Sequence, residues 1–141
     1  VWNGSNYDYY PGDNFCDVIG QGLYLRTSSS NAGRFAAMAH LSPTCTKPVA
    51  ITSCDTFPDP NYCKRDNAMW LWSAPASGEF TAHTDGSYSE TYTSWQRLTD
   101  AYNSKVCVTR DELPDFSTYA LDVSETPATS TETTEQLTAE S

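Results

Sequence analysis

The acidic residues are the side chains of this sequence with the clearest capacity for chemistry. Several follow short runs with strand-like patterning, so we expect them at strand ends, where a cation could bind. The candidate calcium ligands are Asp85, Glu90, Asp111 and Glu112. Asp13 and Asp17 could add oxygens from the amino-terminal arm. The sequence contains no EF-hand loop, and the alternative is that these acids are solvated surface residues.

The residue types used by hydrolases show no catalytic arrangement. The sequence has no GxSxG turn, and neither His40 nor His83 stands in a recognisable nucleophile context. Asp111 and Glu112 could be the paired carboxylates of a glycosidase, but neighbours in a strand point to opposite faces. We therefore predict no catalytic residue and no enzymatic activity.

Five cysteines are a second set of reactive side chains. They are Cys16, Cys45, Cys54, Cys63 and Cys107. Because they lack the paired CxxC spacing of zinc sites, we interpret them as disulfide-forming residues of an oxidising compartment. The odd count leaves one thiol free, buried or bonded to another chain. Cys54 and Cys63 bracket a loop with two prolines and are the best candidates for a local pair, while the other pairings stay open.

Composition excludes several classes of partner. A length of 141 residues fits one domain, and the net charge of -10 argues against nucleic acid and against anionic lipid. The sequence has no run of about 18 apolar residues, so we expect no membrane insertion. It also has no basic, apolar leader, and we expect a processed form or a segment of something longer.

Short runs separated by turn residues predict strands. The predicted strands are residues 22–27, 34–41, 68–73, 79–84, 90–95 and 105–109. Residues 34–41 could instead form a short helix, because Ala and Met favour helix. Asp85-Gly86 predicts a hairpin turn. Together these features predict an all-β protein, an antiparallel β-sandwich of the jelly-roll type that is stapled by disulfides.

The composition changes along the chain and predicts its organisation. Residues 1–15 form an aromatic, flexible or extended arm, or alternatively a first edge strand, and residues 16–123 form the sandwich with a Cys/Pro-rich insert at 42–66. Residues 124–141 are rich in Ser, Thr and Glu and predict a disordered linker, or alternatively a strand donated to a neighbouring subunit. Asn3 begins the N-glycosylation pattern Asn-Gly-Ser, which favours a secreted glycoprotein.

Aromatic side chains are the predicted contacts to a partner or a glycan. These are Trp2, Tyr7, Tyr9, Tyr10, Tyr92 and Trp95. Tyr and Trp combine a large apolar body with a polar tip, which suits a surface used for contact. The aromatic residues of the arm are difficult to bury within so short a segment, so we expect them to bind a partner surface.

Residues 67–112 resemble a known module. The stretch WLWSAPASGEFTAHTDGSYSETYTSW is similar to the core of pre-peptidase C-terminal domains and metacaspase-associated modules, with VCVTRDE in the place of a later strand. The resemblance implies a β-sandwich without catalysis, often secreted and sometimes stabilised by calcium. Arg110 departs from the pattern, because it places a positive charge where the family has a cation ligand.

These observations lead to a hypothesis about function. We predict a non-enzymatic structural or adhesive module of a secreted or cell-surface assembly. The module would self-associate by strand addition and aromatic contacts. Contacts that do not close into a ring would give filaments. One alternative is a carbohydrate-binding module appended to a secreted enzyme. Another is the protruding domain of a viral capsid protein.

Overall fold

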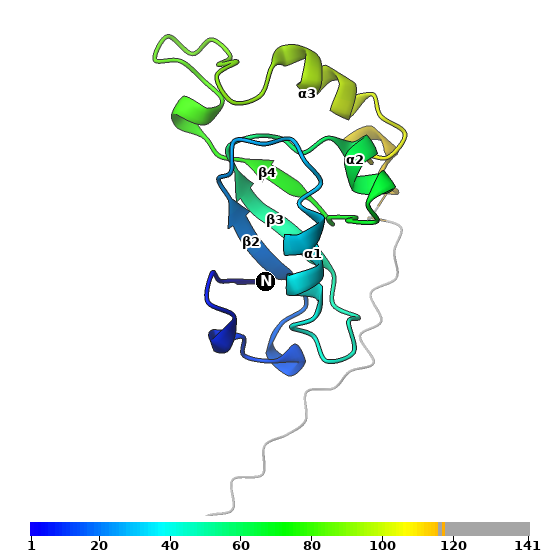
Figure 1. Cartoon of the computed structure of the whole chain (residues 1–141). Helices are drawn as coiled ribbons and strands as arrows, with labels where there is room; N and C mark the ends of the chain where they lie inside the picture. Colours follow the sequence, from blue (N-terminus) through cyan, green and yellow to red (C-terminus); the bar gives the residue numbers. More distant parts are fainter. Residues whose placement is uncertain (116, 118–141) are drawn as a thin grey trace, which may run out of the picture.

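The computed structural model describes residues 1–115 and 117, and the centre of this part is a four-stranded sheet (Figure 1). All three strand pairings are parallel, and the strands lie in the order in which they occur in the sequence. The strands are β1 (Trp2–Asn3), β2 (Ile19–Leu23), β3 (Val49–Cys54) and β4 (Ser73–Pro75). Parallel neighbours need long crossovers, and each connection accordingly contains helical turns.

The described residues form three α-helices and four short 3-10 helices. The α-helices are α1 (Ala32–Ala39), α2 (Pro60–Arg65) and α3 (Trp95–Tyr102). The 3-10 helices are η1 (Tyr7–Tyr9), η2 (Asp13–Phe15), η3 (Gly78–Phe80) and η4 (Arg110–Glu112). N-cap side chains begin two of the α-helices. At α2 the Asp59 side chain accepts the N–H of Asn61 at 2.9 Å, and at α3 the Ser94 side chain accepts the N–H of Arg97 at 3.2 Å. In the part described, no helix is long and apolar enough to cross a membrane.

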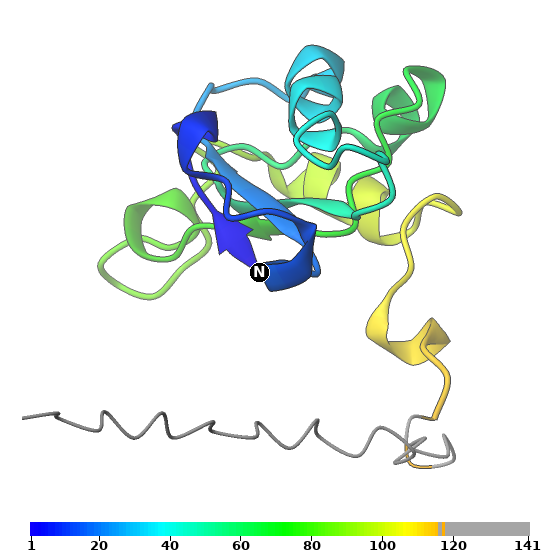
Figure 2. The same ribbon diagram turned by 90° about the horizontal axis from the view of Figure 1, so that it is seen from below.

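Helix α1 covers one face of the sheet, and the main core lies between them (Figure 2). Ile19 of β2 and Val49 of β3 pack against Met38 of α1. Ile19 and Met38 are both 0% exposed, and burial of such side chains stabilises a fold by roughly 1.5–3 kcal/mol each. Phe35 of α1 meets the Trp70 ring edge-on, with 5.2 Å between the ring centroids.

The two outer strands differ from the central pair in having an unpaired edge. Within the described residues, β1 and β4 each have one neighbour in the sheet. Between β1 and β3, the Thr52 hydroxyl donates a hydrogen bond across β2 to Asn3 Oδ1 at 2.9 Å. A Cβ at Gly20 would lie 2.3 Å from Thr52 Cγ2, so a larger residue would force the Thr52 side chain to move.

The predicted fold class is wrong, because the sheet is parallel and covered by helices rather than an antiparallel sandwich. The segment 42–66, predicted as an insert, contains β3, which is one of the two central strands. Val49, Ala50 and Ile51 are at most 3% exposed, and burial on both faces is typical of a parallel strand. A search for alternating polar and apolar residues, which is the pattern of antiparallel strands, therefore does not find β3.

Most predicted strands also lie elsewhere. Residues 34–39 of the segment 34–41 belong to α1, as the helical alternative predicts, because Phe35, Met38 and Ala39 share one helix face. Residues 79–84 overlap η3, and residues 105–109 contain no strand. The turn at Asp85-Gly86 is present, since Gly86 has a φ of 83° and Ala82 bridges antiparallel to Tyr88.

The prediction of a sandwich stapled by disulfides is also wrong. All five cysteines are free, and Cys16, Cys54 and Cys63 are buried. Buried cysteines act as small apolar side chains here: Cys54 packs with Leu23 and Ile51. The aromatic arm is likewise not a free extension, because residues 1–15 contain β1, η1 and η2. The tail predicted at 124–141 lies outside the described residues.

Candidate functional site

A broad hollow lies at the carboxyl ends of β2 and β3, and we take it as the candidate site. Its volume is about 530 Å³. Six residues line it: Tyr24, Leu25, Arg26, Asp55, Phe80 and Tyr92. They come from the ends of two neighbouring strands and from the segment 78–93, which extends beyond the sheet between β4 and α3 (Figure 1). Parallel strands bring their carboxyl ends to one edge, which is where α/β folds build their sites.

Three aromatic rings pack against one another in this hollow, with interplanar angles of 62° and 49°, and we call them the aromatic platform (Tyr24, Phe80 and Tyr92). The centroids of Tyr24 and Phe80 are 5.5 Å apart, and those of Phe80 and Tyr92 are 4.9 Å apart. Tyr24 remains 51% exposed. Exposed rings in a concave site offer an apolar face to a ligand together with polar hydroxyl tips.

Arg26 stands beside the platform in an unusual backbone conformation. Its φ is 48°, in the left-handed region that non-glycine residues seldom adopt. The Arg26 N–H donates to both carboxylate oxygens of Asp55, at 3.0 and 3.3 Å, and Asp55 is 4% exposed. The guanidinium carbon lies 4.8 Å from the Tyr92 ring centroid, and Nη2 donates to the Tyr92 hydroxyl at 3.1 Å. The buried carboxylate thus fixes the turn that presents Arg26 to the platform.

Hydrogen bonds hold the segment 78–93 against the strand ends. Thr93 is buried, and its hydroxyl accepts the N–H of Phe57 at 2.9 Å. The Tyr88 hydroxyl donates to the Thr93 carbonyl at 2.7 Å, and the N–H of Ser89 donates to the Thr81 carbonyl at 3.0 Å. Tyr92 therefore belongs to an anchored segment, and the position of its ring is set by the fold.

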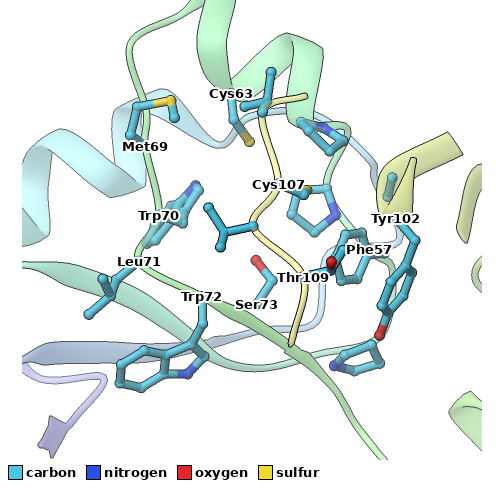
Figure 3. A pocket seen from close by; sticks show the side chains of 16 residues that line it. Phe57, Cys63, Met69, Trp70, Leu71, Trp72, Ser73, Tyr102, Cys107 and Thr109 are labelled. Carbon is cyan, nitrogen blue, oxygen red and sulfur yellow. The ribbon is translucent and has the colours of Figure 1, made fainter. Parts of the chain in front are cut away.

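A second cavity, of about 410 Å³, lies beside β4 (Figure 3). Its walls are mainly apolar and include Trp70, Trp72 and Tyr102, with the thiols of Cys63 and Cys107. Among the described residues that line it there is no Asp, Glu, His, Lys or Arg. Burial raises the pKa of Cys63 to about 11 and that of Cys107 above its usual range, so both thiols are protonated at neutral pH and are poor nucleophiles.

The structure separates the four predicted calcium ligands. Asp85 and Glu90 are exposed in the segment 78–93, and Asp85 accepts hydrogen bonds from Ser87, which lower its carboxyl pKa. Asp111 and Glu112 lie on η4, where Glu112 accepts the N–H of Thr109 at 2.8 Å and its pKa is lowered. No group of three or more potential ligands occurs within residues 1–115 and 117. Calcium binding stays a prediction.

The predicted contact aromatics occupy three different environments. Trp2, Tyr7 and Tyr10 pack against the core cluster of Ile19. Two are well exposed, Tyr9 at 77% and Trp95 at 59%. Tyr92 is the one that belongs to the hollow. Asn3, the predicted glycosylation site, is exposed on β1.

Sequence reasoning misses most of the residues that build the hollow. Tyr24, Arg26, Asp55 and Phe80 are absent from the predicted site, because they are distant in sequence and meet only after the strands pair. One local signal was available: Asp55 directly follows β3, whose first three residues are buried, and an acid at the carboxyl end of a buried strand is a candidate site residue.

Comparison with known proteins gives a consistent result. Residues 2–112 match the family model for glycosyl hydrolase family 26. The sequence is 25% identical over 113 residues to a mannan endo-1,4-beta-mannosidase of Thermothelomyces thermophilus. The matched region covers 80% of this chain and 22% of that protein.

Solved structures agree with this match. A beta-(1,4)-mannanase of Podospora anserina superposes with a TM-score of 0.67 at 24% identity, over 79% of this chain and 23% of that one. A glycosyl hydrolase family 26 domain of a Prevotella bryantii endo-beta-mannanase/endo-beta-glucanase gives a TM-score of 0.59 at 25% identity, over 79% and 34%. This chain spans between about a fifth and a third of the length of these relatives.

These findings overturn the predicted resemblance and the predicted function. Residues 67–112, which resemble pre-peptidase C-terminal and metacaspase-associated modules, lie inside the family match. The prediction of a non-enzymatic, adhesive and filament-forming structural module is wrong, because the matched proteins are glycan-cleaving enzymes. The alternatives of an appended carbohydrate-binding module and a viral capsid protrusion gain no support from these matches. Self-association stays a prediction.

Proposed function

Because the chain belongs to glycosyl hydrolase family 26, we propose that it forms part of the catalytic domain of an enzyme that cleaves β-1,4-linked mannan. Its relatives supply the substrate, since both the matched sequence and the matched structures are mannanases. The chain would contribute one wall of the glycan-binding cleft.

The hollow at the carboxyl ends of β2 and β3 is the observation that carries this proposal. In parallel (β/α) barrels the substrate binds at the carboxyl ends of the strands. The aromatic platform lies at this edge, and its rings can stack on the apolar faces of pyranose rings while their hydroxyls bind sugar hydroxyls. The unpaired edges of β1 and β4 fit the same assignment, because a closed barrel pairs every strand on both sides.

The acid–base chemistry of the cleft needs residues beyond those described. Glycosidases use two carboxyl groups about 5–10 Å apart. Asp55 is the one carboxylate among the described residues that line the hollow, and both of its oxygens accept the Arg26 N–H. Asp55 is therefore a structural clamp, and we assign no catalytic role to it. The chain's own part of the function is to bind and orient the glycan.

We include secretion in the proposal. Mannan is a polymer too large to cross a membrane, so an enzyme that degrades it must meet it outside the cell. The exposed Asn3 in its Asn-Gly-Ser sequence supports a eukaryotic secretory route. Mass spectrometry of secreted material should find a glycan on Asn3 if that route is used.

The test is the release of reducing sugars from linear β-1,4-mannan by the full-length protein, together with its affinity for manno-oligosaccharides. The variant Tyr92→Ala should weaken binding about tenfold or more, because it removes one stacking face of the platform. Tyr62→Ala is the matched control, since Tyr62 is also a tyrosine beside an arginine, with Arg65 4.7 Å from its ring centroid, but lies on α2. Affinity for cellulose or xylan fragments with none for mannan would contradict the substrate, and equal losses in both variants would contradict the site.

A further inference from the structure

Arg26 is an unpaired cation beside the aromatic platform. The ion pairs of the described residues are Arg65–Asp66 and Arg97–Asp59, so within this part of the chain Arg26 has none. Its guanidinium makes one hydrogen bond, from Nη2 to the Tyr92 hydroxyl, which leaves Nε and Nη1 without an acceptor among residues 1–115 and 117. In a chain of net charge -10, an exposed arginine in a ligand-sized hollow without an acidic partner calls for an explanation.

Asp55 does not neutralise this charge through an ion pair. Its carboxylate is 4% exposed, and both oxygens accept the backbone N–H of Arg26 rather than its side chain. The backbone is held in the left-handed region, with a φ of 48°, which is costly for a residue with a side chain. Such strain persists where the surrounding structure enforces it, and here the clamp holds the arginine side chain at the hollow.

We propose that Arg26 makes this site selective for mannans that carry a carboxylate, such as chains with uronic-acid units. This inference rests on the proposed function and specifies its substrate. A guanidinium binds both oxygens of a carboxylate through two parallel N–H groups, one from Nη2 and the other from Nε or Nη1. Nη2 carries two N–H groups and donates one to Tyr92, so one such pair stays free. Bidentate, charge-assisted pairs of this kind are about twice as strong as neutral hydrogen bonds. A neutral sugar hydroxyl offers no equivalent match. Stacking on Tyr92 would hold the guanidinium plane in place while the glycan backbone lies on the platform.

The experiment compares two probes by isothermal titration calorimetry on the full-length protein: β-1,4-mannohexaose, and the same oligosaccharide partly oxidised at C6 to mannuronate. The wild-type protein should bind the oxidised probe about tenfold more tightly, equivalent to about 1.4 kcal/mol. This preference should shrink in high salt, because exposed charge pairs are screened. In Arg26→Gln the ratio of the two affinities should fall to about one, and in Arg26→Lys it should be intermediate.

Two further variants separate charge recognition from folding. Tyr92→Phe removes the hydroxyl that accepts from Nη2 but keeps the ring, so the preference for the oxidised probe should persist. Lys47→Gln makes the same charge change two residues before β3, at the opposite end of the strand, and should keep the wild-type ratio. Equal affinity for both probes in the wild-type protein, or an unchanged ratio in Arg26→Gln, would overturn the proposal and leave mannan binding intact. Absence of binding to either probe would remove the proposed function as well.

Discussion

The carboxylate of Asp55, at the end of β3, accepts the backbone N–H of Arg26, just beyond the end of β2, with 3.0 Å between Oδ2 and N. This contact joins two adjacent strand ends through one buried side chain and sets the floor of the hollow. It also explains how Arg26 keeps a φ of 48°. Fold and candidate site thus depend on the same hydrogen bond.

Replacing Asp55 with Ala should destabilise the protein. The Arg26 N–H would lose its charged acceptor, and a hydrogen bond to a charged group contributes about 1.5–3 kcal/mol. Urea unfolding followed by circular dichroism measures this loss. Asp100→Ala is the control, because Asp100 is exposed and accepts from the neighbouring Gln96 at 2.8 Å; a comparable loss there would remove the special role of Asp55.

Two glycines should respond to alanine in opposite directions. At Gly20 the new Cβ would lie 2.3 Å from Thr52 Cγ2, and overpacking of this kind costs about 1–3 kcal/mol. At Gly33, inside α1, nothing lies within 4 Å of the new Cβ, and alanine should stabilise the helix by about 0.5–1 kcal/mol. Thermal midpoints that move in the same direction for both variants would contradict the arrangement of β1, β2 and β3.

Acid should weaken the fold through Asp66. Hydrogen bonds from Arg65, and then from Ser30, lower its pKa from 3.8 to about 2. A depressed folded-state pKa contributes stability above pH 3.8, and this contribution is lost as the pH falls from about 4 to about 2. Urea unfolding between pH 6 and pH 2 should therefore show a steeper loss in the wild-type protein than in Asp66→Asn. Asp17 is exposed, and Asp17→Asn serves as the control. Identical pH profiles for the wild-type protein and Asp66→Asn would refute the assignment of the acid sensitivity to Asp66.

The five thiols should differ in reactivity. Cys45 is exposed, whereas Cys54 and Cys63 are buried, and burial raises the pKa of each of these two thiols to about 11. A disulfide reagent added at pH 8 should therefore modify Cys45 first, and Cys45→Ser should remove the fast phase. All five thiols should react after denaturation. Fewer than five would mean that some cysteines are bonded.

Some features could be predicted from local sequence. The turn at Asp85-Gly86 and the helical alternative for residues 34–41 depend on neighbours within a few residues, and both are present. The apolar run at 49–52, which lies in the segment predicted as an insert, is part of β3. Strand direction could not be predicted in this way, because parallel pairing depends on the connections between strands and on contacts between segments that are distant in the sequence. The alternation in 67–112 resembles antiparallel strands, although much of this region forms turns, η3 and α3.

The sequence by itself determined the acidity of the chain, its turn at Asp85-Gly86 and the apolar run that begins β3, because these follow from the chemistry of adjacent residues. Only the tertiary structure decided which side chains meet. Arg26 and Tyr92 are 66 residues apart in sequence and share a hydrogen bond, and Arg26 and Asp55 are 29 apart. Parallel pairing of β2 with β3 brings their carboxyl ends to one edge, and the hydrogen bonds of the segment 78–93 then place the aromatic platform beside them.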